Sequence, residues 1–436
     1  MTPDRPTRGR RGRAGRRALV AALALGLVAA ACGSGDDDDE SAAGEGGGSV
    51  DPGAEDVRAV PDEYDTIQEA VDAAAEGDLV LVSPGVYNEA VTVTTPDVVI
   101  RGLDRNEVIL DGEFELDNGI RVLEADGVVV ENMTARNYTA NGFFWTGVDR
   151  YRGSYLTAHN NGDYGIYAFD STTGLFEHSY GSGSPDAGFY IGQCYPCDAV
   201  IRYVVSEHNG LGYSGTNAGG NLLIVESVFR NNRAGIVPNS GDYELYPPER
   251  ETTMVGNLVH DNTNAETAAI ESARLATGNG ILIFGGIDNV VERNRVVDHE
   301  LTGIVLVPNV DSELWPVEGN QIRDNEVTGS GMADLATFDE PGSGNCFAGN
   351  TFDVSAPVEI ERLLPCEGEG EGDRDEGTLD LAALANLEDK PESGDYREQP
   401  VPGPQESMPD ADSAPWEAAG PPPEVDLAAI EVPDGP

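Results

Sequence analysis

Basic side chains are scarce in this 436-residue chain. It has 26 lysines and arginines against 78 aspartates and glutamates, which gives a formal net charge of −52 at pH 7. Such a surface repels nucleic acid and anionic membranes, and a polyanionic glycan would meet it comfortably only through bridging cations. The one lysine, Lys390, lies near the C-terminus. A catalytic lysine is therefore excluded from the first 389 residues.

Metal-binding side chains are also few. The chain has five methionines, five cysteines and five histidines, and the histidines are far apart in the sequence: His159, His178, His208, His260 and His299. Copper sites favour clustered imidazole and thioether ligands, so we expect no transition-metal cofactor. Calcium, which binds carboxylates and turn carbonyls, stays open.

There is only one long apolar run. "ALVAALALGLVAAAC" ends at Cys32 and follows seven arginines in residues 1–17. It has the length of a signal peptide and is too short for a comfortable membrane span, so residues 1–32 are predicted to be an export signal. Its last residues, Ala29 to Cys32, resemble the lipobox of bacterial lipoproteins. The resemblance implies a lipid on Cys32 that anchors the chain to the outer face of the cell membrane. Plain secretion is the alternative.

Both ends of the mature chain have polar, acidic composition. Residues 33–56 are glycine-rich and lack apolar periodicity, which predicts a flexible tether. Residues 367–436 hold 20 acidic residues against 3 basic ones, with many prolines, and are predicted to be disordered apart from a helical turn or two in "LDLAALANLED". The structured domain is therefore expected between residues 57 and 366.

This central part is periodic. A glycine followed by apolar or aromatic residues recurs at intervals of 23, 23, 23, 24, 23, 45 and 23, at Gly119, Gly142, Gly165, Gly188, Gly212, Gly235, Gly280 and Gly303. A second series of short apolar runs with turn asparagines lies between the glycines. Short strands, regular turns and no helix in the gaps predict a solenoid of stacked β coils.

The segment "DTIQEAVDAAAEGDLVLVSPGVYNEAVTV" predicts how the solenoid begins. Ile67, Val71 and Ala74 share one face of a short helix, with Thr66 and Glu69 as a capping box, and two strands follow. Here the chain resembles the right-handed parallel β-helix proteins of the pectin-lyase-like superfamily, in which such a helix caps the N-terminal edge. The resemblance implies an all-β, single-stranded right-handed parallel β-helix of about ten coils. It leaves function open, because the superfamily holds lyases, hydrolases, esterases, epimerases, tailspikes and copper-maturation proteins.

The 45-residue interval is interpreted as one coil with two long loops, Ser240 to Glu251 and Thr263 to Thr277. A third insertion, "PNVDSELWPVEGN", follows Gly303. Loops that leave neighbouring coils of a rigid solenoid commonly build its functional surface. The first loop offers Asp242, Tyr243, Glu244, Tyr246 and Arg250.

Four cysteines form two pairs in the sequence, Cys194 with Cys197 and Cys346 with Cys366. Coils that rise about 4.8 Å each would place the two pairs about 29 Å apart, which excludes one zinc site built from all four thiolates. A redox role for the first pair would want a helix N-terminus, and none is expected there. Two local disulfides in an oxidising compartment are the favoured interpretation.

Two columns on one face are candidates for ligand binding. If the residues one and three after each glycine point inward, the residues two after it point outward and include Phe144, Tyr167 and Tyr190 in successive coils. Five residues after the glycines stand the polar residues Asp170, Gln193, Asn217 and Ser240. An aromatic ladder beside polar groups is typical of a carbohydrate groove. Such columns also stack for stability alone, and a one-residue slip would exchange inside for outside.

Candidate catalytic residues stand two positions before the glycines. Asp163 and Asp186 occupy this position in consecutive coils, and Arg233 occupies it further along. Paired carboxylates suit glycoside hydrolysis, although aspartates at turns often only cap backbone N–H groups. An arginine-based lyase would use Arg202 or Arg233.

Three hypotheses follow. The leading one is an exported lipoprotein that binds, and in some form processes, an extended glycan on the groove around Tyr167 and Tyr190. The second is a carbohydrate-active enzyme on the same groove: a glycoside hydrolase or epimerase that uses Asp163 and Asp186, or an arginine-based lyase. The third is a structural or adhesive envelope protein without a small ligand.

Overall fold

A computed structural model describes residues 49–310, 312–340, 342–386 and 390–436. The predicted export signal, Cys32 and most of the tether lie outside the described residues. Within the described part of the chain, no helix is long and apolar enough to cross a membrane.

The predicted N-terminal helix is present as α1 (Ile67–Ala73). The Thr66 hydroxyl accepts a hydrogen bond of 3.1 Å from the backbone N–H of Glu69, which is the N-cap bond expected of this pair. Ile67 and Val71 are buried, and the helix packs against β1 (Val57–Val60), β2 (Leu79–Val82) and β4 (Val91–Val93). Helix α1 therefore covers the first strands of the solenoid.

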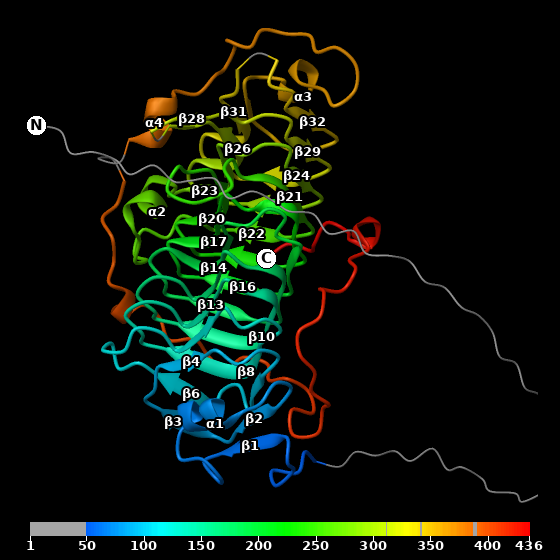
Figure 1. Cartoon of the computed structure of the whole chain (residues 1–436). Coiled ribbons are helices and arrows are strands. Elements are labelled where there is room, and N and C mark those ends of the chain that lie inside the picture. The colour runs from blue at the N-terminus through cyan, green and yellow to red at the C-terminus, as the bar shows by residue number, and fades with distance from the viewer. Residues whose placement is uncertain (1–48, 311, 341, 387–389) are drawn as a thin grey trace, which may run out of the picture. The chain divides into compact units, whose positions relative to one another are not determined.

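The chain winds through three stacks of parallel strands (Figure 1). The first stack contains β1, β2, β5 (Val99–Gly102), β8 (Val129–Arg136), β10 (Asp149–His159), β12 (Thr172–Glu177), β15 (Ala199–Arg202), β18 (Gly219–Val225), β21 (Arg250–Val255), β24 (Val290–Glu292), β29 (Gln321–Arg323) and β32 (Cys346–Ala348). The second contains β3 (Gly85–Tyr87), β6 (Val108–Asp111), β13 (Tyr180–Ser182), β16 (Val205–Glu207), β19 (Val228–Arg230), β22 (Leu258–His260), β25 (Arg295–Val297) and β30 (Glu326–Thr328). The long strands β8 and β10 pair in both stacks and join them.

The third stack is an eleven-stranded sheet, and it carries the glycine repeat. Its strands are β4, β7 (Ile120–Leu123), β9 (Phe143–Thr146), β11 (Ile166–Phe169), β14 (Ala187–Gly192), β17 (Leu211–Thr216), β20 (Ala234–Asn239), β23 (Asn279–Phe284), β26 (Thr302–Val307), β31 (Ala333–Thr337) and β33 (Ser355–Ala356). One strand per coil in this sheet agrees with the expected number of about ten coils. The fold is the predicted right-handed parallel β-helix.

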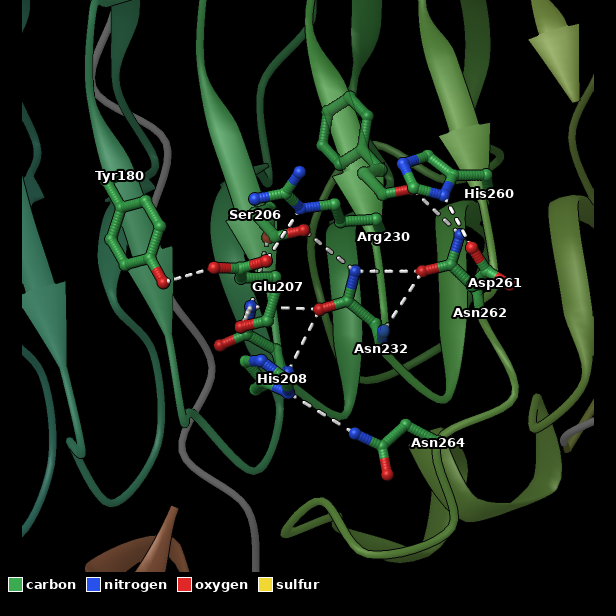
Figure 2. Close-up of polar contacts among 12 residues, drawn as sticks. Tyr180, Ser206, Glu207, His208, Arg230, Asn232, His260, Asp261, Asn262 and Asn264 are labelled. Atoms are coloured by element: carbon green, nitrogen blue, oxygen red, sulfur yellow. Dashed lines mark hydrogen bonds and ion pairs between the residues drawn. The ribbon is translucent and has the colours of Figure 1, made fainter. Parts of the chain in front are cut away.

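Buried asparagines hold the turns between stacks. Asn232 donates its side-chain N–H to the Asn262 Oδ1 atom at 3.0 Å and to the Ser206 carbonyl at 3.0 Å, so each amide links neighbouring coils (Figure 2). Asn257, Asn294 and Asn325 repeat the arrangement further along the solenoid. These asparagines belong to the second repeat series. Their amides satisfy turn backbone groups that would otherwise be buried without partners.

Short elements outside the coils lie against the outer face of the third stack and against the C-terminal coils. They are helix α2 (Glu271–Leu275), the antiparallel pair β27 (Asn309–Val310) and β28 (Leu314–Trp315), helix α3 (Ile360–Leu363) and helix α4 (Leu381–Ala385). The long loops after Gly235 and Gly303 are thus confirmed as insertions between strands.

Both predicted disulfides are present, Cys194 with Cys197 and Cys346 with Cys366. The first closes a turn between β14 and β15. The second links β32 to the segment after α3 at the C-terminal end of the solenoid.

The prediction of a disordered tail is wrong for residues 390–436. This segment contains the single turns η2 (Tyr396–Glu398) and η3 (Leu427–Ala429), and it runs along the solenoid in both directions (Figure 1, orange to red). From the later coils it descends past Asn160, which donates to the carbonyls of Tyr396 and Gln399. At the early coils Arg101 donates to the carbonyls of Ala411, Ala414 and Pro415.

The tail then returns toward the later coils. Arg293 donates to the carbonyls of Leu427 and Ile430, and Arg295 donates to that of Pro433. Arginines of the coils therefore hold the tail through its backbone carbonyls. This explains why an acidic, proline-rich composition did not keep the segment away from the acidic domain.

Candidate functional site

The aromatic residues of the outward column lie side by side in the eleven-stranded sheet. Tyr167 is in register with Phe144 on one side and Tyr190 on the other, and Tyr190 is in register with Ser214. Ile166 and Ala168, the neighbours of Tyr167 along β11, are buried in the interior cluster. The tyrosine side chain therefore points out of the solenoid.

The rings do not form the flat platform that we expected. Phe144 and Tyr167 stack at 4.7 Å between centroids with 28° between planes, and Tyr164 stacks on Tyr167 at 4.4 Å and 10°. The faces of these rings contact one another. The rings therefore present their edges and hydroxyl groups, and not their faces, to the outside of the solenoid. Tyr190 is only 1% exposed and is covered by the loop after β20.

The polar column also has a different role from the one expected. Gln193 accepts a hydrogen bond from the Leu245 N–H at 3.0 Å. The Asn217 side chain donates to the Gly241 and Glu244 carbonyls and accepts from the Gly241 N–H. The Ser240 hydroxyl accepts from the Glu249 N–H at 2.8 Å. These side chains fasten the loop of residues 240–249 over the sheet. Only Asp170 of this column is exposed.

The two candidate catalytic carboxylates are brought together. The Asp186 N–H donates to the Asp163 carbonyl at 3.1 Å, so the two residues stand at the same turn of successive coils. Asp186 is 8% exposed, and its Oδ2 atom accepts a hydrogen bond of 2.6 Å from the Tyr164 hydroxyl. Asp163 is half-buried.

Burial sets the protonation of both groups. It raises the pKa of Asp163 to about 6. For Asp186 burial and the nearby charges of Asp163 and Glu244 outweigh the Tyr164 hydrogen bond and raise the pKa to about 7. A carboxyl with a pKa near 7 exchanges a proton at neutral pH, which is what general acid–base chemistry requires.

A third acid joins them from the loop. Glu244 accepts a hydrogen bond of 2.7 Å from the Tyr190 hydroxyl, and burial raises its pKa to about 7. The sequence analysis identified Glu244 only as one polar residue of the loop. Its contact with Tyr190 depends on how the loop folds back over the sheet, and no sequence pattern predicts that fold. Tyr164 was missed, although it directly follows Asp163 in the repeat.

Tyr164, Asp186 and Glu244 line one end of a cavity of about 530 Å³ on the outer face of the eleven-stranded sheet, and Asp163 stands behind Asp186 on the preceding coil. Its floor comes from strands β17, β20, β23 and β26, and its walls come from the 240–249 loop, α2, β27 and α4. Half of the lining residues are aliphatic, and Tyr164, Asp186 and Glu244 stand at the polar end. The volume falls in the range of small-molecule sites.

The arginine candidates have structural roles instead. Arg233 is fully buried, and its guanidinium donates to the carbonyls of Ala265, Thr267, Pro391 and Glu392. Arg233 therefore fixes the second long loop and the tail, and the prediction that it is catalytic is wrong. Arg202 forms an ion pair with Glu177 at 2.7 Å.

Among the described residues, no group of three or more His, Cys, Asp and Glu side chains is arranged to hold a metal ion. The acids of the cavity pair with tyrosine hydroxyls. Carboxyl and phenol groups can exchange protons and can donate and accept hydrogen bonds.

A comparison with protein-family models agrees with the fold. The family model "Right handed beta helix region" matches residues 109–247. No curated protein matches the chain. Among solved structures, the chain is similar to the A-module of the mannuronan C-5 epimerase AlgE4 from Azotobacter vinelandii, with 16% identity, a TM-score of 0.46 and coverage of 66% of this chain and 92% of that one.

Two further structures show a similar degree of likeness. A polygalacturonase from Erwinia carotovora ssp. carotovora has 12% identity and a TM-score of 0.49, with coverage of 70% and 95%. An alginate lyase from Paenibacillus sp. has 13% identity and a TM-score of 0.43, with coverage of 72% and 98%.

Proposed function

We propose that the chain binds a glycan on the outer face of the eleven-stranded sheet, at the cluster of Asp163, Tyr164, Asp186 and Glu244. The observation that carries this proposal is the pairing of buried carboxyl groups with tyrosine hydroxyls at the polar end of a cavity. Carboxyl and phenol groups can donate and accept hydrogen bonds, and a few such groups beside apolar walls are the usual means of orienting a hydroxyl-rich ligand.

A second candidate is turnover of the bound glycan. The raised pKa values of Asp163 and Asp186 favour it, because Asp186 at about 7 is partly protonated at neutral pH while Asp163 at about 6 is mainly ionised. Two carboxyl groups in different protonation states are the arrangement that glycosidases use as acid and base. Asp186 would then donate the proton and Asp163 would accept one.

Affinity electrophoresis of the full chain tests both candidates. Gels are cast with a panel of neutral and acidic polysaccharides, with and without calcium, and the polymer is then analysed for new ends. Retardation with intact polymer supports binding alone, and new ends support turnover. The Asp186→Asn variant should lose retardation or turnover, whereas Asp170→Asn, an exposed aspartate outside the cavity, should keep both. Equal behaviour of the two variants would overturn the proposed site.

The proposal includes export and a lipid anchor at Cys32. The two disulfides support an oxidising compartment. With an acyl-modified Cys32, the mature chain should partition into the detergent phase of an extract, and Cys32→Ala should move it to the aqueous phase. Recovery of wild-type chain in the aqueous phase, with a mass that shows no acyl group, would leave plain secretion.

A further inference from the structure

The floor of the cavity changes character along the solenoid. Ser214 and Val237 are in register on consecutive strands, and Leu282 and Val305 continue the same row on β23 and β26. At about 4.8 Å per strand, these four residues of the floor span about 14 Å. The row is polar at Ser214, beside the acids, and it becomes aliphatic away from them.

The walls of the aliphatic part offer few polar groups to a ligand, and the two amides of its floor already form hydrogen bonds. Asn239 bonds Thr216, Ser214 and the Val237 carbonyl, and Asn279 bonds Thr302 and the Ala276 carbonyl. The remaining side chains of these walls are mostly apolar, with Ser272 of α2 and Asn309 of β27 as polar exceptions; the apolar ones are Leu211, Ile270, Leu275, Phe284, Val307, Val310, Leu381 and Leu384. A sugar placed against these walls would lose hydrogen bonds to water with little replacement.

The acid end differs in the same respect. Glu244 Oε1 accepts from Tyr190, but Oε2 is buried and has no hydrogen-bond partner among the described residues. Asp186 and Tyr164 also line the cavity there. This end suits a neutral head that carries hydroxyl groups. It disfavours a carboxylate or phosphate head, which three neighbouring acids would repel.

We propose that the cavity holds the apolar chain of a glycan-bearing amphiphile, with the sugar at Asp186, Tyr164 and Glu244 and the alkyl or acyl chain over Val237, Leu282 and Val305. This inference rests on the proposed function and adds the substrate class. The ligand is a neutral sugar joined to an aliphatic chain. Helix α4 covers the chain through Leu381 and Leu384, which both line the cavity.

Isothermal titration calorimetry of the full chain with methyl, hexyl and octyl glycosides of several neutral sugars, below their micelle concentrations, tests the inference. Each buried methylene should strengthen binding about fourfold, so the octyl glycosides should bind about fifteenfold tighter than the hexyl ones. Octanol, which lacks the sugar, should bind more weakly than the octyl glycosides.

Variants keep the test independent of folding. Leu381→Asp changes a wall residue outside the coils and should reduce the ratio of octyl to hexyl affinity toward one. Val86→Asp should leave the ratio unchanged, because Val86 is an exposed residue of β3 that does not line the cavity. Circular dichroism confirms that both variants fold.

The outcomes separate this inference from the proposed function. Retardation by polysaccharides without any dependence on alkyl chain length overturns the inference and leaves the proposed function standing. Equal affinity for octanol and octyl glycosides shows an apolar site with no part in sugar binding, and it overturns the inference. Chain-length dependence that Leu381→Asp does not reduce places the chain elsewhere and also overturns it.

Discussion

The Tyr164 hydroxyl donates a hydrogen bond of 2.6 Å to the Oδ2 atom of Asp186, which stands at the corresponding turn of the next coil. Tyr164 thus orients a buried acid toward the polar end of the cavity. The bond also partly opposes the effect of burial on the Asp186 pKa. The acid, its orienting tyrosine and the cavity form one unit.

Asp186 should make folding stability depend on pH. Its pKa rises from 3.8 in the unfolded chain to about 7 in the folded one, so the folded state holds the proton more tightly. The contribution of Asp186 to stability should therefore fall as pH rises from about 4 to about 7 and stay constant above that. Urea unfolding of wild type and Asp186→Asn at several pH values measures it as the difference between the two proteins. The free energy of unfolding of wild type minus that of Asp186→Asn should fall as pH rises from about 4 to about 7. If it stays flat or rises, the raised pKa is contradicted.

Asn217 should hold the 240–249 loop through its side chain. Asn217→Ala removes buried hydrogen bonds to Gly241 and Glu244. Asp170→Ala is a matched control, because the two residues have φ angles of 48° and 51° and alanine meets the same backbone strain at both. We expect the Asn217 variant to lose about 1–3 kcal/mol more stability in this loop than the control. Chymotrypsin cleavage near Tyr243 reports loop opening, and equal cleavage rates in the two variants would contradict this role.

The periodic part of the fold follows from the sequence because the same contacts repeat every 23 residues. The glycine positions gave the eleven-stranded sheet, the outward side of Tyr167 and the proximity of Asp163 to Asp186. The state of each outward residue could not be predicted in this way. Tyr190 has the same repeat position as Tyr167 but is buried, because a loop from two coils later folds over it.

Composition misled the prediction for the tail. The acidic, proline-rich composition of residues 367–436 indicates disorder, because it provides few apolar side chains to bury. The observed contacts instead join backbone carbonyls of the tail to arginines of the coils, among them Arg101 and Arg293. Carbonyl groups are present in every sequence, so only the spatial arrangement of the arginines shows where the tail binds.

Arg101 should be the strongest single attachment of the tail. It is buried, pairs with Glu131 at 2.7 Å and donates to three tail carbonyls. Arg101→Ala leaves the buried Glu131 with only its 3.6 Å pair to Arg152 and should cost up to about 3 kcal/mol of stability. It should also expose residues 411–417 to a glutamyl endopeptidase at Glu417, which is the glutamate nearest to the carbonyls that Arg101 holds. Arg121→Ala, which removes a more exposed pair with Asp117, should cost less than about 1 kcal/mol and leave the tail protected. Equal protection of the tail in both variants would contradict its attachment through Arg101.

The two disulfides should contribute unequally to stability. Cys346 and Cys366 are 20 residues apart, whereas Cys194 and Cys197 are three apart. The chain-entropy account gives about 3 kcal/mol for the longer loop and about 2 kcal/mol for the shorter one. Urea unfolding of the two double serine variants measures both. A larger loss for the Cys194 and Cys197 variant would show that the turn depends on its bridge for local geometry.

The central claim is that a glycan binds at the cluster of Asp163, Tyr164, Asp186 and Glu244. The most direct test is hydrogen–deuterium exchange of the full chain with and without the polysaccharide that retards it most in affinity gels. The account predicts new protection in residues 161–170, 184–193 and 240–249 and little change elsewhere. A second set of stacked aromatic side chains, Tyr155, His178 and Tyr203, lies at another turn of the coils. Protection confined to the backbone amides around these three residues, or no protection at all, would contradict the account.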